Sequence, residues 1–456
     1  MITMSSEHNI EILESEPQQI GDDLIGRTAA ISTRFWIVCL GLAVLLLLGI
    51  VGFVLRTSDG HAGHTQLGYY ATVFAYLLTA AQGAPIVAIA LRAIKAEWRR
   101  PLSRAAQLFA VVGLFNLILY IPLMMALPNT DGRYTIWVNW HPHSPHVYDT
   151  LSIIGLVVCG IALLYVSALP DMHAAVGKIP GTRNKILKFL SRGWTGSSAQ
   201  WRLHRAIIGV LGGLYFMFFV FVHFTISSDF AMSLVPGWKD AIFPAWHALS
   251  GLQSGVALVM VTLFILRIAG YKKYISVNQF WSLSKIMLAL TLLWAYFWFA
   301  GFLTFWYGRM PIELKLIRFL FVETYLWPFV LAVILTFAVP FLLLLWNGIR
   351  KSVWGPSLAG LSILIGTFFD RIRIYVASTS IKNPTGHDFS IPPAVFPQVA
   401  DILIILGGLG GALLVYLIAT KFIPILSVWE TKEGLLYQVV KPVLKSRYIV
   451  MGKVPE

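Results

Sequence analysis

Several ionisable and amide side chains lie inside or at the ends of long apolar segments of this sequence. Asp149 opens one such segment directly after the His-rich stretch WVNWHPHSPHVYD, and His146 precedes it by one helical turn. His223 and Asp229 lie near the end of a second segment, and Gln82 lies in the middle of a third, within TAAQGAP. An ionisable group inside a bilayer is costly and generally functional. Carboxylates and histidines in these positions indicate proton transfer.

A second set of charged residues lies in later apolar segments: Glu323, Asp370, Arg371 and Asp401. These residues are candidates for a separate proton route. Asp370, followed by Arg371 and Arg373, is also consistent with a self-neutralising structural pair, because charges inside a membrane readily pair. His247 is expected to pack as an aromatic side chain.

The ligand sets of the common metal cofactors are incomplete in this sequence. The two cysteines, Cys39 and Cys159, lie in apolar runs, whereas iron–sulfur and zinc sites need three or four ligands. A haem b module needs histidines that face each other across two helices, usually as two spaced pairs. Only His223 and His247 lie inside apolar segments. We therefore expect this chain to bind no haem, metal or iron–sulfur cluster.

The segments that carry these residues are transmembrane helices. Charged residues make up 12% of the 456 residues and hydrophobic residues 57%, whereas soluble domains average about 25% charged residues. A helix needs about 20 apolar residues to cross the hydrocarbon core. Ten runs satisfy this: 35–55, 69–92, 105–127, 148–169, 206–227, 243–267, 280–306, 317–346, 355–377 and 396–419. The sequence therefore predicts an all-α transmembrane fold of about ten helices, the eighth kinked at Pro328 or Pro340.

Basic residues in the short loops predict the orientation. Lysine and arginine are frequent in the loops after helices 2, 4, 6 and 8 and in the C-terminal tail, and mostly sparse in the alternate loops. The loop after helix 7, with Arg309, Lys315 and Arg318, is an exception. Because cytoplasmic loops are rich in Lys and Arg, both termini are expected in the cytoplasm. That the membrane is a bacterial inner membrane is implied by the resemblance described below. The net charge of +14 is a topology signal rather than a sign of nucleic-acid binding.

Five ordered motifs resemble a known family. They are AEWRRPLSRAA, HSPHVYDTLS leading to YVSALPD, SSDFAMSLVPG followed by WKDAIFP, FFDRIRIYVAS, and KFIPILSVWETK, and they span roughly residues 75–432. Together they resemble the NrfD/polysulfide-reductase family of integral membrane subunits, in the branch found in bacterial alternative complex III.

The resemblance implies two four-helix bundles, helices 2–5 and 6–9, flanked by helices 1 and 10. It divides the chain into a cytoplasmic segment (1–33), helix 1 with the first bundle (34–227), the second bundle with helix 10 (228–419) and a cytoplasmic tail (420–456). It further implies a respiratory or photosynthetic complex with three partners: a periplasmic iron–sulfur, molybdopterin-like subunit, a multihaem cytochrome c subunit and a second NrfD-like membrane subunit.

The resemblance also implies a quinone site, for menaquinone or ubiquinone, near the periplasmic face of the first bundle. There Asp149 is the candidate base for quinol oxidation, and His223 or Asp229 orients the ring or passes the proton on. The candidate quinone-binding residues are Gln82, His146 and Trp238. The family branch usually has a histidine at the position of Gln82, and glutamine can hydrogen-bond a quinone carbonyl but cannot take its proton.

Two other functions remain open. The chain is alternatively a non-catalytic anchor that holds peripheral redox subunits, a reading that Gln82 supports and Asp149 and Asp229 oppose. The third possibility is a proton-coupled transporter, which only the intramembrane charges favour. Transporters more often show matching broken helices in two halves, and this sequence has one such helix, at Gln82 to Pro85, without a convincing counterpart.

Overall fold

Long helices build almost all of the part of the chain that the computed structural model describes, residues 16–58, 63–137, 140–436, 438–443 and 446–451. Residues 1–15 and 452–456 of the two expected cytoplasmic segments lie outside this part. Within it, nine helical segments are long and apolar enough to cross a membrane. They are α2 (Thr33–Thr57), α3 (Gly68–Ala93), α4–α5 (Arg100–Gln107 and Val112–Ala126), α6 (Ser144–Ala175), α8 (Ser198–Asp229), α9 (Phe243–Leu266), α10 (Val277–Gly308), α12–α13 (Leu326–Val333 and Val339–Leu345) and α17 (Val399–Ala419). The all-α transmembrane fold is confirmed.

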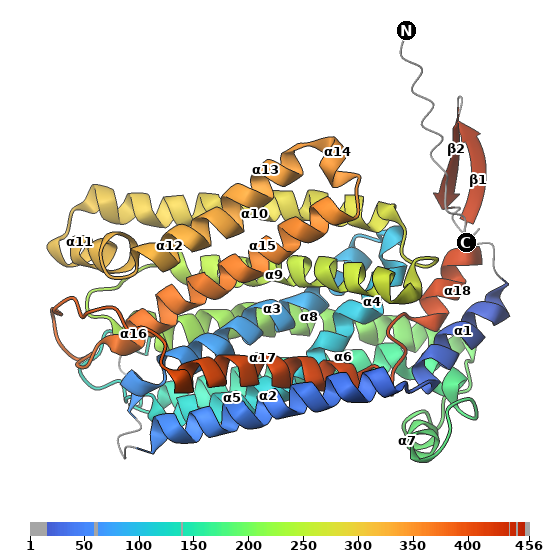
Figure 1. Ribbon diagram of the computed structural model, residues 1–456, viewed down its shortest axis with the longest axis horizontal. Helices are drawn as coiled ribbons and strands as arrows, with labels where there is room; N and C mark the ends of the chain where they lie inside the picture. Colours follow the sequence, from blue (N-terminus) through green and yellow to red (C-terminus); the bar gives the residue numbers. More distant parts are fainter. Residues whose placement is uncertain (1–15, 59–62, 138–139, 437, 444–445, 452–456) are drawn as a thin grey trace, which may run out of the picture.

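The expected span at 355–377 is a helix that is less apolar than the other nine. It comprises α15 (Trp354–Arg371), a π-helical turn (η8, Ile372–Val376) and α16 (Ala377–Ser380). Asp370, Arg371 and Arg373 lower its mean hydropathy. It nevertheless runs alongside α9 and α12 as a full-length member of the helix array (Figure 1).

Shorter elements connect the long helices at their ends. The short α-helices are α1 (Pro17–Ala29), α7 (Thr182–Leu190), α11 (Pro311–Ile317), α14 (Asn347–Arg350) and α18 (Val428–Leu436). The 3-10 turns are η1 (His64–Gln66), η2 (Glu97–Arg99), η3 (Leu108–Val111) and η4 (Met232–Leu234), and the π-helical turns are η5 (Arg267–Tyr271), η6 (Arg318–Val322) and η7 (Ile334–Ala338). Strands β1 (Gln438–Val443) and β2 (Ser446–Met451) pair antiparallel, from Gln438 opposite Met451 to Val443 opposite Ser446.

The eighth expected span, 317–346, is interrupted by a turn at residues 323–325, between η6 and α12, and contains the π-helical turn η7, which ends two residues before Pro340. Proline has no N–H, so the carbonyl of Thr336, four residues earlier, loses its usual helical partner. Gln253 of α9 donates its side-chain N–H to that carbonyl at 3.1 Å. A neighbouring helix therefore satisfies the group that the proline leaves free, as spans in lipid require.

The long helices form two contacting groups. Helices α3, α5, α6 and α8 contact one another in one group, and α9, α10, α12–α13 and α15 contact one another in the other. This is the arrangement expected of helices 2–5 and 6–9. The groups meet where α3 crosses α9, and there Gly83 and Gly255 bring the two backbones together, because a Cβ on Gly255 would lie 2.5 Å from the Gly83 carbonyl oxygen.

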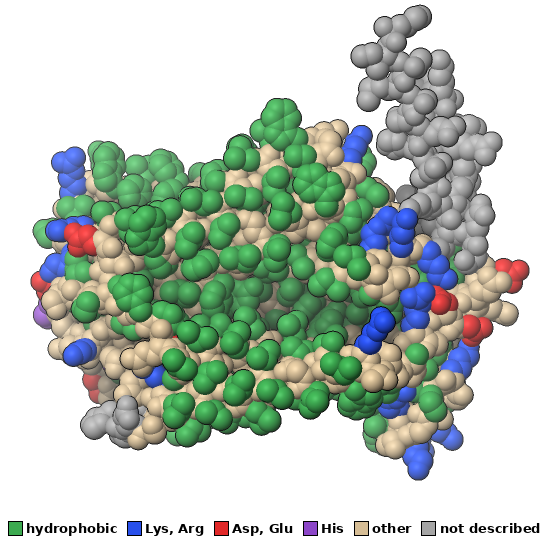
Figure 2. All heavy atoms as spheres, in the orientation of Figure 1, with side chains coloured by type: hydrophobic (Ala, Val, Ile, Leu, Met, Phe, Trp, Pro, Cys, Tyr) green, Lys and Arg blue, Asp and Glu red, His purple; other side chains and the backbone are tan. Residues whose placement is uncertain are grey.

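Helices α2 and α17 flank the two groups as a pair. A Cβ on Gly49 of α2 would lie 2.6 Å from the Cα of Gly407 of α17, so only glycine allows this approach. The outward face of α2 exposes Trp36, Ile37 and Leu40 by more than 60% each. Because they are apolar and exposed on a helix long enough to span a membrane, these side chains are suited to contact with lipid. Figure 2 shows hydrophobic side chains over the middle of the molecule's face and Lys and Arg gathered mainly toward its two ends.

Alternate loops gather at opposite ends of the helix array. At one end, Arg183 of α7 donates to the backbone carbonyl of Thr28 in the last turn of α1, and Arg27 of α1 donates to the backbone carbonyl of Gly270 in η5. At the other end, Tyr134 bonds His387 and Lys315 pairs with Asp388. Helices α1 and α18 contact each other at the first end, so both ends of the described chain lie on one side (Figure 1). We call the end of the helix array that carries α1, α7 and α18 the basic end, and the opposite end, which carries Tyr134 and His387, the aromatic end.

Candidate functional site

Asp149 and Asp229 meet at the aromatic end of the first helix group. Helix α6 begins at Ser144, with Pro145 in its first turn, and therefore places Asp149 in its second turn. Helix α8 runs in the opposite direction and ends at Asp229. Both side chains are fully buried, and their carboxyl groups are close enough to interact. The expectation that the two carboxylates reach the same depth is confirmed.

The loop between α5 and α6 covers this carboxyl pair. Trp137 donates its indole N–H to Oδ2 of Asp229 at 2.8 Å. Arg133 donates to the carbonyls of Pro128 and Asn129, both at 2.7 Å, and to the hydroxyl of Ser233 at 3.2 Å. Burial lowers the pKa of the Arg133 guanidinium, whereas Asp229 and Asp149 act in the opposite direction. Arg133 is therefore the cation that faces the two carboxylates.

The carboxyl oxygens of Asp149 have no hydrogen-bond partner of good geometry among the described residues. One oxygen of Asp229 is also without a partner. The nearest polar groups are hydroxyls: Thr225 interacts with Asp149, and Ser152 donates to the Asp149 backbone carbonyl at 2.8 Å. Buried polar groups in folded proteins are almost always hydrogen-bonded. Asp149 is therefore available for a water molecule or for the polar group of a ligand.

A second polar cluster lies where the two helix groups meet. The rings of His223 (α8) and His247 (α9) have centroids 5.0 Å apart, and Nε2 of His247 is 3.0 Å from the hydroxyl of Tyr375. Nε2 of His223 and Nδ1 of His247 are buried and lack partners among the described residues. The sequence suggested that His247 packs only as an aromatic side chain. In the structure His247 is also part of a polar cluster with His223 and Tyr375.

Three charged residues border this second cluster. Asp370 pairs with Arg373 at 2.6 Å and with Arg371 at 3.3 Å, so one carboxylate faces two buried guanidinium groups. Arg371 also donates to the hydroxyl of Thr79 on α3 at 3.1 Å. Electrostatic interactions reach Tyr375 from Arg371, Asp370 and Asp149. The ion pair expected at Asp370 is present, and Arg371 extends it toward the histidines.

Gln82 lies far from the carboxyl pair. Its amide N–H donates to the Phe109 carbonyl at 3.3 Å, and its amide oxygen accepts from Tyr215 at 3.1 Å. Tyr215 and Asp229 are 14 residues apart on α8, which corresponds to about 21 Å along a helix. The expectation that Gln82 borders the same site as Asp149 and Asp229 is therefore wrong, because Gln82 is bonded within the protein toward the basic end.

His146 and Trp238 occupy two other places at the aromatic end. His146 lies one turn before Asp149 and contacts the ring of His143, with centroids 5.3 Å apart. The rings of Trp238 and Phe243 have centroids 4.6 Å apart and are tilted by 46°, in an aromatic cluster at the start of α9. Trp137 contacts the carboxyl pair, whereas the ring contacts of Trp238, a candidate quinone-binding residue, lie in this aromatic cluster.

Glu323 and Asp401 do not form a continuous track with Asp370 and Arg371. Glu323 is 40% exposed and pairs with Arg318 at 2.6 Å, beyond the end of η6. Asp401 is buried, accepts the backbone N–H of Gln398 in the first turn of α17 and lies 3.4 Å from Arg56. The first is a surface ion pair and the second caps a helix, so the expected grouping is wrong.

Sequence reasoning missed Trp137, Arg133 and Tyr375. In the sequence both Trp137 and Arg133 lie in a short stretch between two apolar runs, and no pattern there links either one to the carboxyl groups. Tyr375 follows Asp370, Arg371 and Arg373 on one helix, so a search for polar residues on the same helix would have included it. For Trp137 the sequence carries no signal beyond its place in the loop before Asp149.

Within the described part of the chain, no group of three or more His, Cys, Asp and Glu side chains is arranged to hold a metal ion. No protein-family model matches the sequence. No curated protein sequence matches it either. The motifs quoted above are therefore the whole basis of the family resemblance.

Proposed function

We propose that this chain is the quinol-oxidising membrane subunit of a multi-subunit electron-transfer complex. The observation that carries the proposal is Asp149, a fully buried carboxyl group without a hydrogen-bond partner among the described residues, beside Asp229. A quinol is a neutral, membrane-soluble donor of two hydrogen bonds, and the carboxyl oxygens are acceptors. The aromatic side chains of Trp137 and Tyr148, stacked with centroids 4.8 Å apart, would border the ring.

Oxidation of one quinol to quinone releases two protons and two electrons. Asp149 would accept the first proton and pass it to Asp229, which interacts with it, and Asp149 would then be free to accept the second proton once the first has left for the water at the aromatic end. Two carboxylates at close range repel each other when both are charged, so a pair of this kind favours one shared proton. The two electrons would leave to an iron–sulfur cluster of a partner subunit bound at the aromatic end, because this chain has too few cysteines for a cluster of its own.

Proton translocation coupled to this reaction would use the second polar cluster. His223, His247 and Tyr375 form a row of buried groups with unpaired nitrogens, and the field of Asp149 reaches Tyr375. Ordered water commonly bridges such groups in a protein interior. This row replaces Glu323 and Asp401 as the proposed route, with Asp370 and Arg371 at its edge.

The basic end would face the cytoplasm of a bacterial inner membrane, and the aromatic end the periplasm. Lysine and arginine in the short loops support this orientation. The proposed partners are the periplasmic iron–sulfur subunit, a multihaem cytochrome c subunit and a second related membrane subunit, and the proposed substrate is menaquinol or ubiquinol.

One observation favours a second function, that of a non-catalytic membrane anchor. Gln82 takes the place of the family's usual histidine, and its amide is occupied by Phe109 and Tyr215. A chain that had lost its quinone site would still hold partner subunits at the aromatic end. Quinone that co-purifies with wild-type protein would favour the quinol-oxidising function.

The decisive experiment is the substitution Asp149→Asn in the intact complex. We expect loss of quinol oxidation with normal assembly, because asparagine keeps the shape but cannot accept the proton. Asp401→Asn is the matched control: it changes another buried carboxyl at the aromatic end, whose partners are Arg56 and Gln398, and should leave turnover per assembled complex near the wild-type value. Wild-type turnover in Asp149→Asn would refute the site and leave the anchor function.

A further inference from the structure

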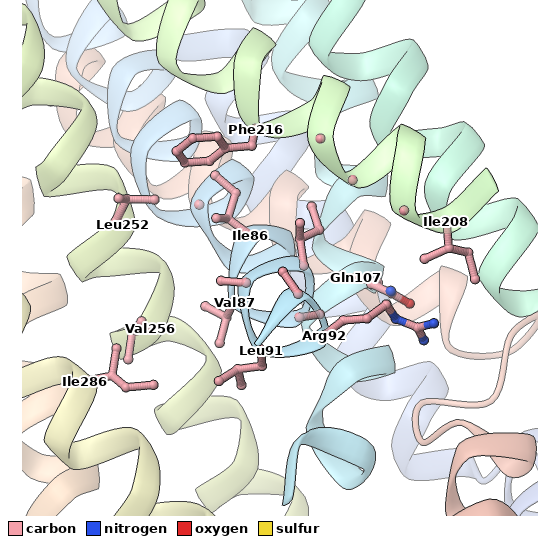
Figure 3. Close-up of a pocket in the computed structure, with 18 of the residues that line it drawn as sticks. Ile86, Val87, Leu91, Arg92, Gln107, Ile208, Phe216, Leu252, Val256 and Ile286 are labelled. Atoms are coloured by element: carbon pink, nitrogen blue, oxygen red, sulfur yellow. The ribbon is translucent and has the colours of Figure 1, made fainter. Parts of the chain in front are cut away.

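A groove of about 540 Å³ lies near the basic end, between α8 and α10, and helices α3 and α9 form its floor. Figure 3 shows Phe216 of α8 at one end and Ile208 of the same helix at the other, with Leu252, Val256 and Ile286 across the opening. On α3 the lining runs from Gly83 to Ala93, which corresponds to about 15 Å along the helix axis. None of Asp149, Asp229, His223 and His247 lines it. The groove is therefore separate from the proposed quinol site.

Two glycines of α8 keep the groove open. Gly209 and Gly213 are four residues apart, both line the groove, and a Cβ on either would meet no atom within 4 Å. The rest of the lining is almost entirely aliphatic. A surface of this kind at membrane depth contacts hydrocarbon.

The end of the groove nearest the basic end is polar. Arg92 and Gln107 line it, and their side chains lie close together in Figure 3. Arg92 also pairs with Glu430, which occupies only part of the guanidinium, because arginine has five N–H donors. Arg205, one turn before Ile208 on α8, does not line the groove; it is 63% exposed and pairs with Glu433 at 3.5 Å. Together with Arg92, Arg99 and Arg100 it belongs to a group of four guanidinium groups that share three carboxylates, those of Glu97, Glu430 and Glu433. An apolar channel that ends at Arg92 is complementary to an anionic amphiphile.

We propose that this groove binds one anionic phospholipid, with its acyl chains along Gly209 and Gly213 and its phosphate at Arg92. Clusters of basic residues at the cytoplasmic ends of transmembrane helices commonly bind lipid phosphates. The aliphatic lining along α3 and α8 suits acyl chains, and the guanidinium of Arg92 at the basic end suits a phosphate. The proposal does not depend on quinol oxidation.

The test uses the purified full-length chain in mixed micelles with equal amounts of phosphatidylglycerol and phosphatidylcholine of the same chain length. Native mass spectrometry counts the lipids that remain bound. We expect one retained phosphatidylglycerol on the wild-type protein. Gly213→Phe should fill the groove and lower the retained fraction about tenfold, since excluding even two methylene groups from an apolar site costs this much affinity. Gly41→Phe is the matched control, because Gly41 also has nothing within 4 Å but lies on α2, outside the groove.

Arg205→Gln distinguishes recognition of the lipid headgroup charge from binding of the acyl chains. It should reduce the preference for phosphatidylglycerol over phosphatidylcholine, while the groove still binds acyl chains. Equal lipid retention by wild type, Gly213→Phe and Gly41→Phe would overturn the proposal. A retained isoprenoid quinone that Gly213→Phe removes would overturn it in favour of a quinone tail. Release of another membrane protein by Gly213→Phe, without any retained lipid, would overturn it in favour of a partner helix.

Discussion

The crossing of α3 and α9 should be intolerant of a single added methyl group, and Gly255→Ala tests this. A Cβ on Gly255 would lie 2.5 Å from the carbonyl oxygen of Gly83 and 2.9 Å from the backbone nitrogen of Ala84. The nearest atom is the Gly83 carbonyl carbon at 2.4 Å, whereas ordinary Cβ contacts begin at 3.4 Å, so the two backbones would have to part by about 1 Å. All three obstructing atoms are backbone atoms, which cannot swing aside.

The expected cost follows from that separation. A gap of 0.5–1 Å forfeits about a quarter to a half of each dispersion contact, and overpacked sites typically lose about 1–3 kcal/mol. Alanine returns about 0.5–1 kcal/mol of helix propensity. We therefore expect Gly255→Ala to lower the free energy of unfolding by about 1–2 kcal/mol. Gly41→Ala, on the open face of α2, has the same propensity gain without the clash and should be neutral or slightly stabilising.

The measurement is unfolding of the purified protein by sodium dodecyl sulfate in lipid–detergent micelles, followed by tryptophan fluorescence. Gly83→Ala obstructs the same helix crossing from the side of α3. The loss of unfolding free energy in the double variant should therefore be smaller than the sum of the losses in Gly83→Ala and Gly255→Ala. The shift should also disturb the histidine cluster, because a Cβ on Gly251, one turn from Gly255, would lie 3.0 Å from Nε2 of His223. If Gly255→Ala is as stable as Gly41→Ala, the close approach of α3 and α9 is wrong.

Three further outcomes are expected. Asp171→Ala should cost about 3–5 kcal/mol of unfolding free energy in the same assay, because it leaves the buried guanidinium of Arg104, 3.0 Å away, without its carboxylate. Burial raises the pKa of Asp240 above 3.8, so the folded protein favours the protonated carboxyl group. Its contribution to the free energy of unfolding is therefore present at low pH and is lost as the pH rises from about 4 through the raised pKa. When the free energy of unfolding is measured as a function of pH, Asp240→Asn should lack this decline. A topology reporter inserted after His143 should read periplasmic, and one inserted in α7 (Thr182–Leu190) cytoplasmic; the opposite readings would invert the proposed orientation.

The number, position and direction of the helices could be predicted from the sequence. Runs of about 20 apolar residues have no other stable arrangement in a bilayer than a helix, because every backbone group must be bonded within the segment. The meeting of Asp149 and Asp229 could be predicted for the same reason, since consecutive spans run in opposite directions and the two residues lie at adjoining ends of α6 and α8.

Which way each helix faces was decided only by the tertiary structure. A helix that is apolar on all sides carries no pattern to show which residues point to lipid and which to a neighbour. Gln82 was therefore expected beside Asp149, whereas its side chain is bonded to Tyr215 and Phe109. Trp238 was expected to bind quinone, but the tryptophan that contacts Asp229 is Trp137, from the loop before α6.

The meeting of His223 and His247 with Tyr375 depends on contacts between residues more than 100 positions apart in the chain. It requires α8, α9 and the α15–η8 helix to converge. Their convergence depends on how closely α3 and α9 approach, which Gly83 and Gly255 permit. In a membrane, where burial of apolar surface does not drive helices together, such small-residue contacts and interhelical hydrogen bonds select the partners, and only the folded chain brings them into register.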